Sequence, residues 1–348
     1  MLSSSQTRRG RLMSEYVCVR ITRMDEMDIG LFDYDRYNTL YFFMLNAEEH
    51  IYMRYGGRDS SSPNKYLNLD SLELALEQGL AIHRRYLSGD WLPPQRPEQL
   101  LPDEIPALVE QTTAKGRCVE CHLIGDLQNV QRERDGVLDK LSQMFRSPDI
   151  KRLGIELDIP KGLVVKSSWG AVDAAGLLNG DRIVEFEGVP VWTFGDLQYA
   201  YDRVDRRANQ IQLTIQRAMK YIDIDITLPV RWWWTDLTYR QLTVDPRSYF
   251  RSSPLTSEQK KTWGLDLLGF AGEVTDIDSV AQLLSLHTLS IGDIVFAVDG
   301  IGRDEVANTP ELFIQLHTRA GDTLTLGIIR GGVRMLMTLK TARMSYRK

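Results

Sequence analysis

The sequence predicts a mixed α+β, mostly β, protein of several domains. Three observations support this fold class. The chain has 348 residues, about twice the usual size of one domain. Its C-terminal half contains an internal repeat of strand-like segments that end in turn glycines. Its N-terminal half alternates strand-like and helix-like segments until a proline-rich stretch interrupts the pattern.

The composition is that of an ordinary globular protein. Apolar residues make up 43% of the chain, charged residues make up 26%, and the formal net charge is −5. Lys and Arg are spread without basic runs interleaved with aromatics, which argues against nucleic acid as a partner. Apolar runs such as LYFFML are far shorter than the roughly 20 residues of a membrane span. The basic opening SSSQTRRGRL is not followed by the apolar run of a signal peptide.

Residues 16–86 have the signals of a small α/β domain. YVCVRI alternates apolar and polar residues, and TLYFFMLN and EHIYMRYGG are strand-like. A helix is expected after a cap at Asp70 or Ser71, because leucines then recur every three or four residues. This order resembles the second half of a thioredoxin-like domain, so residues 1–90 are expected to form a degenerate, incomplete one. No Cys-x-x-Cys precedes the helix, so the resemblance implies no redox activity for this domain.

A linker and a cysteine motif follow in residues 91–150. Five prolines between Trp91 and Pro106 cannot sustain a helix or a central strand. Cys118, Cys121 and His122 come next, in KGRCVECHLI. Two cysteines three apart, with a histidine after the second, have the spacing of c-type haem attachment, in which the histidine binds the iron. The segment is expected to have no core of its own.

Other interpretations of the cysteines stay open. A redox dithiol should open a helix after a buried strand, whereas a helical stretch and a glycine turn precede Cys118. A structural disulfide is a further alternative, and zinc would need a second ligand pair. Met144 is the candidate second iron ligand or else a core methionine, and His83 is another candidate. Cys18 is expected to be a buried thiol.

The internal repeat pairs GLLNGDRIVEFEGVPV with TLSIGDIVFAVDGIGR. Their Gly-Asp pairs, at 180–181 and 292–293, lie 112 positions apart (292 − 180), and Arg217 and Arg330 lie 113 apart (330 − 217). Each copy has a strand, a glycine turn, a short helix and a closing hairpin. Two domains of the same fold are therefore expected.

The repeat resembles the PDZ domain, in the arrangement found in bacterial periplasmic proteases. The first copy, SSWGAVDAAGLLNGDRIVEFEG, is close to the family motif Ser-Pro-Ala-x-x-Ala-Gly-Leu-x-x-Gly-Asp, whereas the second lacks the Ala-Gly step. The resemblance implies PDZ-like β-barrel domains at 151–229 and 263–345. The Trp-rich connector 230–262 is expected to bury its tryptophans against a neighbouring domain.

The PDZ resemblance implies peptide binding. In that family a peptide adds as a strand, and the amides of a loop hold its C-terminal carboxylate. The segments that match this loop are RLGIEL, with Leu153, Gly154 and Ile155, and TWGLDL, with Gly264 and Leu265. Grooves filled by the protein's own linkers, or used for assembly, are an equal alternative.

The sequence thus predicts an electron-transfer protein with one haem c, bound by Cys118, Cys121 and His122, with Met144 as second iron ligand. Its PDZ-like domains would dock a protein redox partner or a peptide C-terminus, and it could be a subunit of a larger complex. The alternatives are a PDZ adaptor without haem and a thiol-disulfide oxidoreductase. No hydrolytic constellation is present, so a carrier is favoured over a protease. Covalent haem implies a periplasmic or extracytoplasmic location. A truncated N-terminus would reconcile that location with the missing signal peptide.

Overall fold

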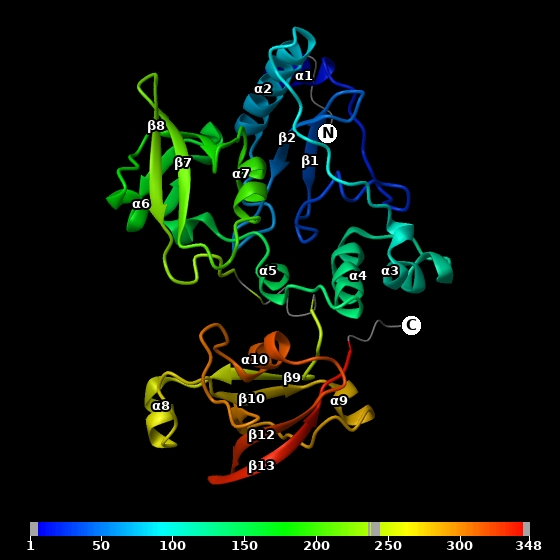
Figure 1. The fold of residues 1–348 in the computed structure, drawn as a ribbon, viewed down its shortest axis with the longest axis vertical. Helices are drawn as coiled ribbons and strands as arrows, with labels where there is room; N and C mark the ends of the chain where they lie inside the picture. The colour runs from blue at the N-terminus through cyan, green and yellow to red at the C-terminus, as the bar shows by residue number, and fades with distance from the viewer. Residues whose placement is uncertain (1–5, 236, 238–243, 344–348) are drawn as a thin grey trace. The chain divides into compact units, whose positions relative to one another are not determined.

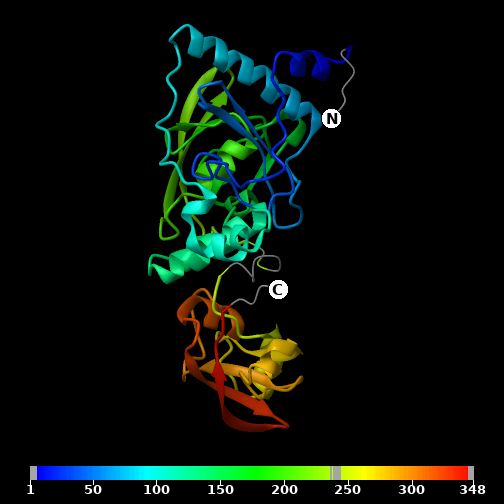
Figure 2. The ribbon, with the colours of Figure 1, turned by 90° about the vertical axis from the view of Figure 1, so that its right-hand side faces the viewer.

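The computed structural model describes residues 6–235, 237 and 244–343 (Figures 1 and 2). The chain divides into two compact units, Met1–Arg240 and Gln241–Lys348. The described residues form four antiparallel sheets with short helices between their strands, which agrees with the predicted mixed α+β class. No helix in these ranges has both the length and the apolar character needed to cross a membrane.

The N-terminal part of the first unit is a hairpin covered by a helix. Its elements are α1 (Arg8–Ser14), β1 (Tyr41–Leu45), β2 (Ile51–Gly56) and α2 (Leu69–Leu87). Asn68 caps α2, because its side-chain oxygen accepts the backbone N–H groups of Asp70 and Ser71. Leucines of α2 pack on Met44, Tyr52 and Met53 of the hairpin, and burial of each such side chain contributes about 1.5–3 kcal/mol. The two predicted strands and the helix are therefore present, and the helix begins after a cap at Asn68 instead of the predicted Asp70 or Ser71.

The expected strand YVCVRI is not formed. Val17 is 93% exposed, Val19 is 75% exposed, and Cys18 is exposed as well, so the prediction of a buried thiol was wrong. The sheet formed by β1 and β2 has two strands among the described residues, and neither pairs with this segment. A segment with alternating apolar residues becomes a buried strand only where a neighbouring strand pairs with it and a core packs on its apolar face.

The segment that contains the cysteine motif packs into the first unit. Its helical elements, from η1 to α5, are η1 (Pro102–Glu104), α3 (Pro106–Gln111), η2 (Thr113–Lys115), α4 (Cys121–Arg134) and α5 (Lys140–Met144). The buried face of α4 lies against α3 and includes Ile124 and Leu127. Asp126 of the same helix accepts the Tyr37 hydroxyl at 2.9 Å. The segment shares its core with its neighbours, because Asp126 bonds to a residue 89 positions away.

The first repeat completes this unit. Its elements are η3 (Ile150–Leu153), β3 (Ile155–Leu157), η4 (Ile159–Lys161), β4 (Val165–Ser168), α6 (Ala171–Ala174), β5 (Arg182–Phe186), β6 (Val189–Pro190), α7 (Phe194–Tyr201), β7 (Gln210–Arg217) and β8 (Lys220–Thr227). Strands β3 and β4 form a hairpin, and the other strands form a sheet in the order β6-β5-β7-β8. Trp232 packs on Tyr201, with ring centroids 5.0 Å apart, and Trp233 packs on Phe145 at 4.7 Å. These tryptophans of the connector are buried, as expected.

The second repeat forms the second unit. Its elements are β9 (Phe250–Pro254), α8 (Ser257–Thr262), β10 (Gly272–Ile277), α9 (Ser279–Leu283), β11 (Ile294–Val298), α10 (Pro310–His317), β12 (Thr323–Arg330) and β13 (Val333–Lys340). The five strands form one sheet in the order β13-β12-β11-β10-β9. Strand β9 lies within the predicted connector 230–262, so the unit includes residues before the predicted boundary at 263.

The repeated Asp and Arg residues form the same ion pair in both repeats. Arg217 Nη2 lies 2.6 Å from Asp181 Oδ2, and Arg330 Nη2 lies 2.6 Å from Asp293 Oδ2. Both aspartates are buried, and each also accepts a backbone N–H from the turn before it. The motif shared by the two copies therefore fixes the turn against the closing hairpin.

Candidate functional site

The first candidate site is the groove between β3 and α7. Strand β3 pairs with β4 on one side, and no strand of the described residues pairs with its other edge. The predicted residues Leu153, Gly154 and Ile155 lie where this strand begins. Gly154 has a φ of +90°, and a Cβ there would lie 2.0 Å from the Trp169 carbonyl oxygen, so only glycine fits. The side chains of Leu153 and Ile155 are buried, so the backbone is what this segment offers to a ligand.

Residues 54–66 of the same chain, the internal segment, lie along α7. The Arg54 backbone N–H donates to Asp196 Oδ1 at 2.8 Å, and the Thr193 hydroxyl donates to the Arg54 carbonyl. Gln198 binds the Arg58 backbone at both ends, because its Oε1 accepts the N–H at 3.1 Å and its Nε2 donates to the carbonyl at 2.8 Å. Figure 1 shows α7 beside β2, the strand at which this segment begins. The helix thus holds the segment through its backbone.

The other wall of the groove contacts the same segment. Lys151, in the turn before β3, lies 3.3 Å from the buried carboxylate of Asp59. Asp149 accepts the Ser60 hydroxyl at 3.2 Å. The ring of Tyr66 stacks on Phe194 of α7, and Tyr66 also lines a pocket of about 280 Å³ beside β3. The internal segment therefore occupies the helix side of the groove and reaches the turn before β3, and the pocket beside β3 remains open.

Two glycines permit this close packing. A Cβ at Gly195 would lie 2.6 Å from the Arg54 carbonyl oxygen, and a Cβ at Gly57 would lie 2.6 Å from the Phe194 ring. Real Cβ atoms do not approach backbone so closely. Gly195 lets the helix approach the Arg54 backbone, and Gly57 leaves room in the segment for the Phe194 ring.

Burial affects two carboxylates of the groove in opposite directions. Burial raises the pKa of Asp196 to about 6, and the amide donors from Arg54 and Trp192 offset only part of that effect. Burial also opposes ionisation of Asp59, but hydrogen bonds from Ser61 and the nearby Lys151 outweigh it and lower its pKa. The charged form of Asp196, on the helix side of the groove, is thus disfavoured, and the charged form of Asp59, on the strand side, is favoured.

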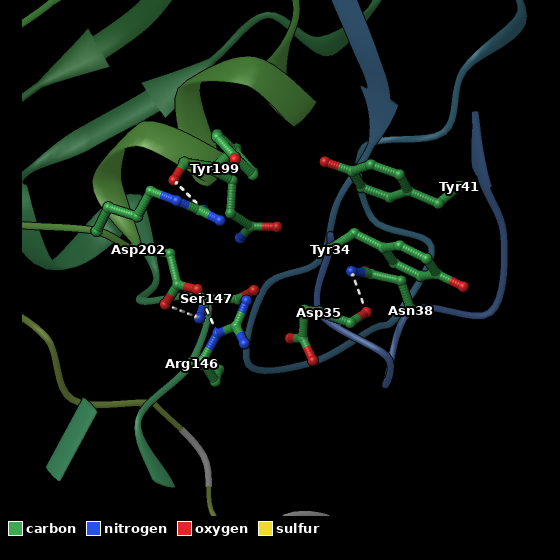
Figure 3. Close-up of a pocket in the computed structure, with 10 residues that line it drawn as sticks. Tyr34, Asp35, Asn38, Tyr41, Arg146, Ser147, Tyr199 and Asp202 are labelled. Atoms are coloured by element: carbon green, nitrogen blue, oxygen red, sulfur yellow. Dashed lines mark hydrogen bonds and ion pairs between the residues drawn. The ribbon is translucent and has the colours of Figure 1, made fainter. Parts of the chain in front are cut away.

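A polar network also holds α7 beside the internal segment, near the C-terminal end of the helix (Figure 3). Arg146 Nε donates to Asp202 at 2.5 Å, and the Ser147 backbone N–H donates to the same carboxylate at 2.7 Å. These residues line a cavity of about 10 Å³ together with Tyr34 and Tyr41, which is room for about one water. The Tyr41 hydroxyl donates to the Gly195 carbonyl at 3.1 Å. The helix is therefore held near both of its ends, which fixes its position in the first unit.

The second candidate site is the corresponding groove between β9 and α10. In the first repeat Trp169 N–H donates to the Gly154 carbonyl at 3.0 Å, and in the second Asp278 N–H donates to the Tyr249 carbonyl at 3.0 Å. Tyr249 has a φ of +55°, so it occupies the backbone position of Gly154. Strand β9, which follows it, lies at the edge of its sheet. The loop and strand that face α10 are therefore at 247–254.

The predicted residues Gly264 and Leu265 lie elsewhere in the second repeat. They follow α8, and their backbone N–H groups bond to Lys261 and Lys260 at the end of that helix. The Gly264 carbonyl accepts Arg334 from β13. An insertion explains the difference, because residues 255–271, including α8, join β9 to β10, whereas residues 158–164 join β3 to β4. The sequence signal that could have located the strand is Arg-Ser-Tyr-Phe, which parallels Arg-Leu-Gly-Ile.

The cysteine motif lies at the start of α4. Cys121 is the first residue of the helix, Cys118 lies in the loop before it, and both are free thiols. Cys118 is exposed, Cys121 is partly exposed, and the His122 side chain is 55% exposed, 3.6 Å from Glu120. All three side chains can therefore be reached from solvent. No group of three or more His, Cys, Asp or Glu side chains arranged to hold a metal ion occurs within the described ranges.

The two proposed iron ligands differ in accessibility. Met144 is fully buried at the end of α5, next to the Phe145 that packs on Trp233, whereas His122 faces solvent. A haem on the exposed side of His122 would reach Met144 only if that core opened. His83 is engaged elsewhere, because its Nδ1 lies 2.7 Å from the Tyr52 hydroxyl. Cys118, Cys121 and His122 fit thioether attachment and one axial ligand, whereas neither Met144 nor His83 is placed to serve as the second ligand.

Comparison with known proteins gives a distant likeness only. No family model and no curated protein matches the chain. Among solved structures it is similar to the HtrA-type protease AlgW with decapeptide, at 15% identity and a TM-score of 0.23, over 38% of this chain and 41% of that one. It is also similar to AlgW with tripeptide, at 13% identity and a TM-score of 0.24, over 40% of this chain and 55% of that one. The chain thus spans about half of these proteases, and the groove geometry is the stronger guide to function.

Proposed function

We propose that this protein is a PDZ-like adaptor that binds an extended peptide segment of a partner in the groove of its second repeat. The main support is that the helix of the first repeat already binds main-chain groups of residues 54–66, through the side chains of Asp196 and Gln198. The second repeat has the same strand and helix, and the outer edge of β9, like that of β3, has no paired strand among the described residues. An open edge beside a helix accepts an added strand.

The internal segment also supports the kind of ligand that we propose. Its main-chain groups at Arg54 and Arg58 bond to side chains of the helix, at Thr193, Asp196 and Gln198, so α7 binds this segment through its main chain. The first repeat would then serve to assemble the N-terminal part of the protein, and the second would face partners. This division assigns each copy of the repeat a separate role.

A substitution in β9 tests the proposal. The full chain is screened against displayed random decapeptides with free C termini, and the selected peptides are titrated by fluorescence polarisation. S252P removes the N–H that an added strand requires, at an edge position where proline is tolerated. S253A changes an exposed side chain of the same strand, keeps every backbone N–H and is the control. We expect wild type and S253A to bind alike. We expect S252P to bind at least about tenfold more weakly, which corresponds to the loss of about one good hydrogen bond.

Two results would contradict this function. Selection could yield no peptide that binds the full chain in solution. Alternatively, S252P could bind as tightly as wild type while its circular dichroism spectrum matches that of wild type. Either outcome would place binding away from the β9 edge.

A second candidate function is electron transfer through a haem c at Cys118, Cys121 and His122. The supporting observation is that all three side chains reach solvent, as covalent attachment requires. When bound, the haem would supply one-electron redox chemistry, with thioethers to both cysteines and His122 on the iron. An extracytoplasmic location belongs to this candidate function.

Expression with haem-attachment machinery tests the second function. The expected result is a pyridine haemochrome spectrum and a mass increase of one haem, both lost in a double C118S and C121S variant. A colourless protein of unmodified mass would exclude it. If that colourless protein formed a reversible disulfide between the two cysteines, the thiol-disulfide oxidoreductase would be favoured instead.

A further inference from the structure

A glutamate of α10 crosses the second groove. Glu311 accepts both the backbone N–H and, at 2.8 Å, the side-chain hydroxyl of Ser252 on β9. Because β9 is the edge strand, this outward N–H is a donor that an added strand would use. The carboxylate of Glu311 thus takes the place of a ligand carbonyl.

The first repeat has no side chain at the corresponding position. Helices α7 and α10 each have eight residues and follow a threonine cap, Thr193 or Thr309. Counted from the cap, Gly195 corresponds to Glu311. The Arg54 backbone of the internal segment packs directly on Gly195, where a larger residue would exclude it. The groove that holds a segment therefore has glycine here, and the groove without one has glutamate.

Ser252 supplies two of the hydrogen bonds that Glu311 accepts, and Thr309 and the Glu311 backbone supply others. Glu311 is partly buried, burial raises its pKa, and the hydrogen bonds from Ser252 oppose that rise. Among the residues that the structure describes, no Lys, Arg or His forms an ion pair with it. If a peptide carbonyl took the Ser252 N–H, the carboxylate would lose that donor without leaving its partly desolvated position. Loss of a hydrogen bond by a carboxylate in such a position opposes binding.

We propose that the second groove selects peptides that present a lysine or arginine side chain beside the residue that pairs with Ser252. The inference rests on the proposed peptide-binding function and names its ligand class. A cationic side chain offers several N–H donors and a compensating charge to Glu311, whereas a backbone amide offers one donor. Glu311 thereby weakens the binding of peptides that lack a basic residue at that position. Selectivity then comes from weaker binding of the wrong peptides.

The test uses peptides selected on the full wild-type chain. Each Lys or Arg of a selected peptide is replaced in turn by norleucine, which keeps an apolar stem and removes the charge. We expect one position at which this replacement weakens binding about tenfold, the effect of losing one charged hydrogen-bonded pair. In E311Q the same replacement should weaken binding by less than about threefold. E258Q, an exposed carboxylate of α8 in the same unit, is the control and should retain the full effect.

The outcomes distinguish failure of the basic preference from failure of the proposed peptide-binding function. If peptides bind through β9, as the loss in S252P shows, but tolerate norleucine at every position, the basic preference is refuted and peptide binding stands. If E311Q discriminates as wild type does, another group recognises the basic residue and the inference fails. If no peptide binds, the proposed function itself fails. The norleucine peptides are measured on the wild-type protein, so this part of the test does not depend on whether any protein variant folds.

Discussion

Replacing Gly195 by alanine should separate the internal segment from α7. The new Cβ would lie 2.6 Å from the Arg54 carbonyl oxygen and 3.1 Å from the Tyr55 nitrogen, where ordinary contacts begin at 3.4 Å. The neighbours are backbone atoms of β2, so the strand must move by about 0.8 Å (3.4 − 2.6). Overpacking of this kind costs about 1–3 kcal/mol. Alanine gains about 1 kcal/mol in a helix, so the net loss in unfolding free energy is about 0–2 kcal/mol.

A second helical glycine provides the control for G195A. Gly125 lies in α4, and a Cβ there would make ordinary contacts of 3.6 Å with Arg36. G125A should therefore gain up to about 1 kcal/mol. Urea unfolding followed by circular dichroism measures both variants, and limited proteolysis measures protection of the internal segment. The reasoning is refuted if G195A is as stable as G125A and its residues 57–65 stay as protected as in wild type.

Three further predictions follow from burial and charge. Because burial raises the pKa of Asp196 to about 6 from its ordinary 3.8, its contribution to the unfolding free energy is full below pH 3.8 and is lost as pH rises toward 6. The change is roughly 1.4 kcal/mol per unit of pKa difference, and D196N should lack it in urea titrations across this range. The pKa of Asp59 is lowered, so its contribution is present above pH 3.8 and disappears in acid. D59N should cost about 1–3 kcal/mol at pH 7 and little at pH 2, and equal costs at both would contradict this. Cys18 should react with a thiol reagent in the native state as fast as Cys118, and a requirement for denaturant would show that it is buried.

Local interactions explain what could be predicted from the sequence. The hairpin of residues 41–56, the helix after Asn68 and the repeated Asp-Arg pairs depend on neighbours in sequence or on one nearby hairpin. The loop at Gly154 was located because its glycine is required by the backbone. Tyr249 adopts the same backbone without a glycine, and an insertion separates its strand from the matching motif, so β9 was missed.

The sequence by itself determined the repeat, its turns and the spacing of Cys118, Cys121 and His122. Only the tertiary structure decided that α7 binds the internal segment, because the contact between Arg58 and Gln198 joins residues 140 positions apart. It also decided that YVCVRI is exposed and that Met144 is enclosed, since exposure depends on which surfaces meet. Periodicity shows that a segment has an apolar face. Burial of that face requires a second surface packed against it, and contacts between residues distant in sequence determine which surface that is.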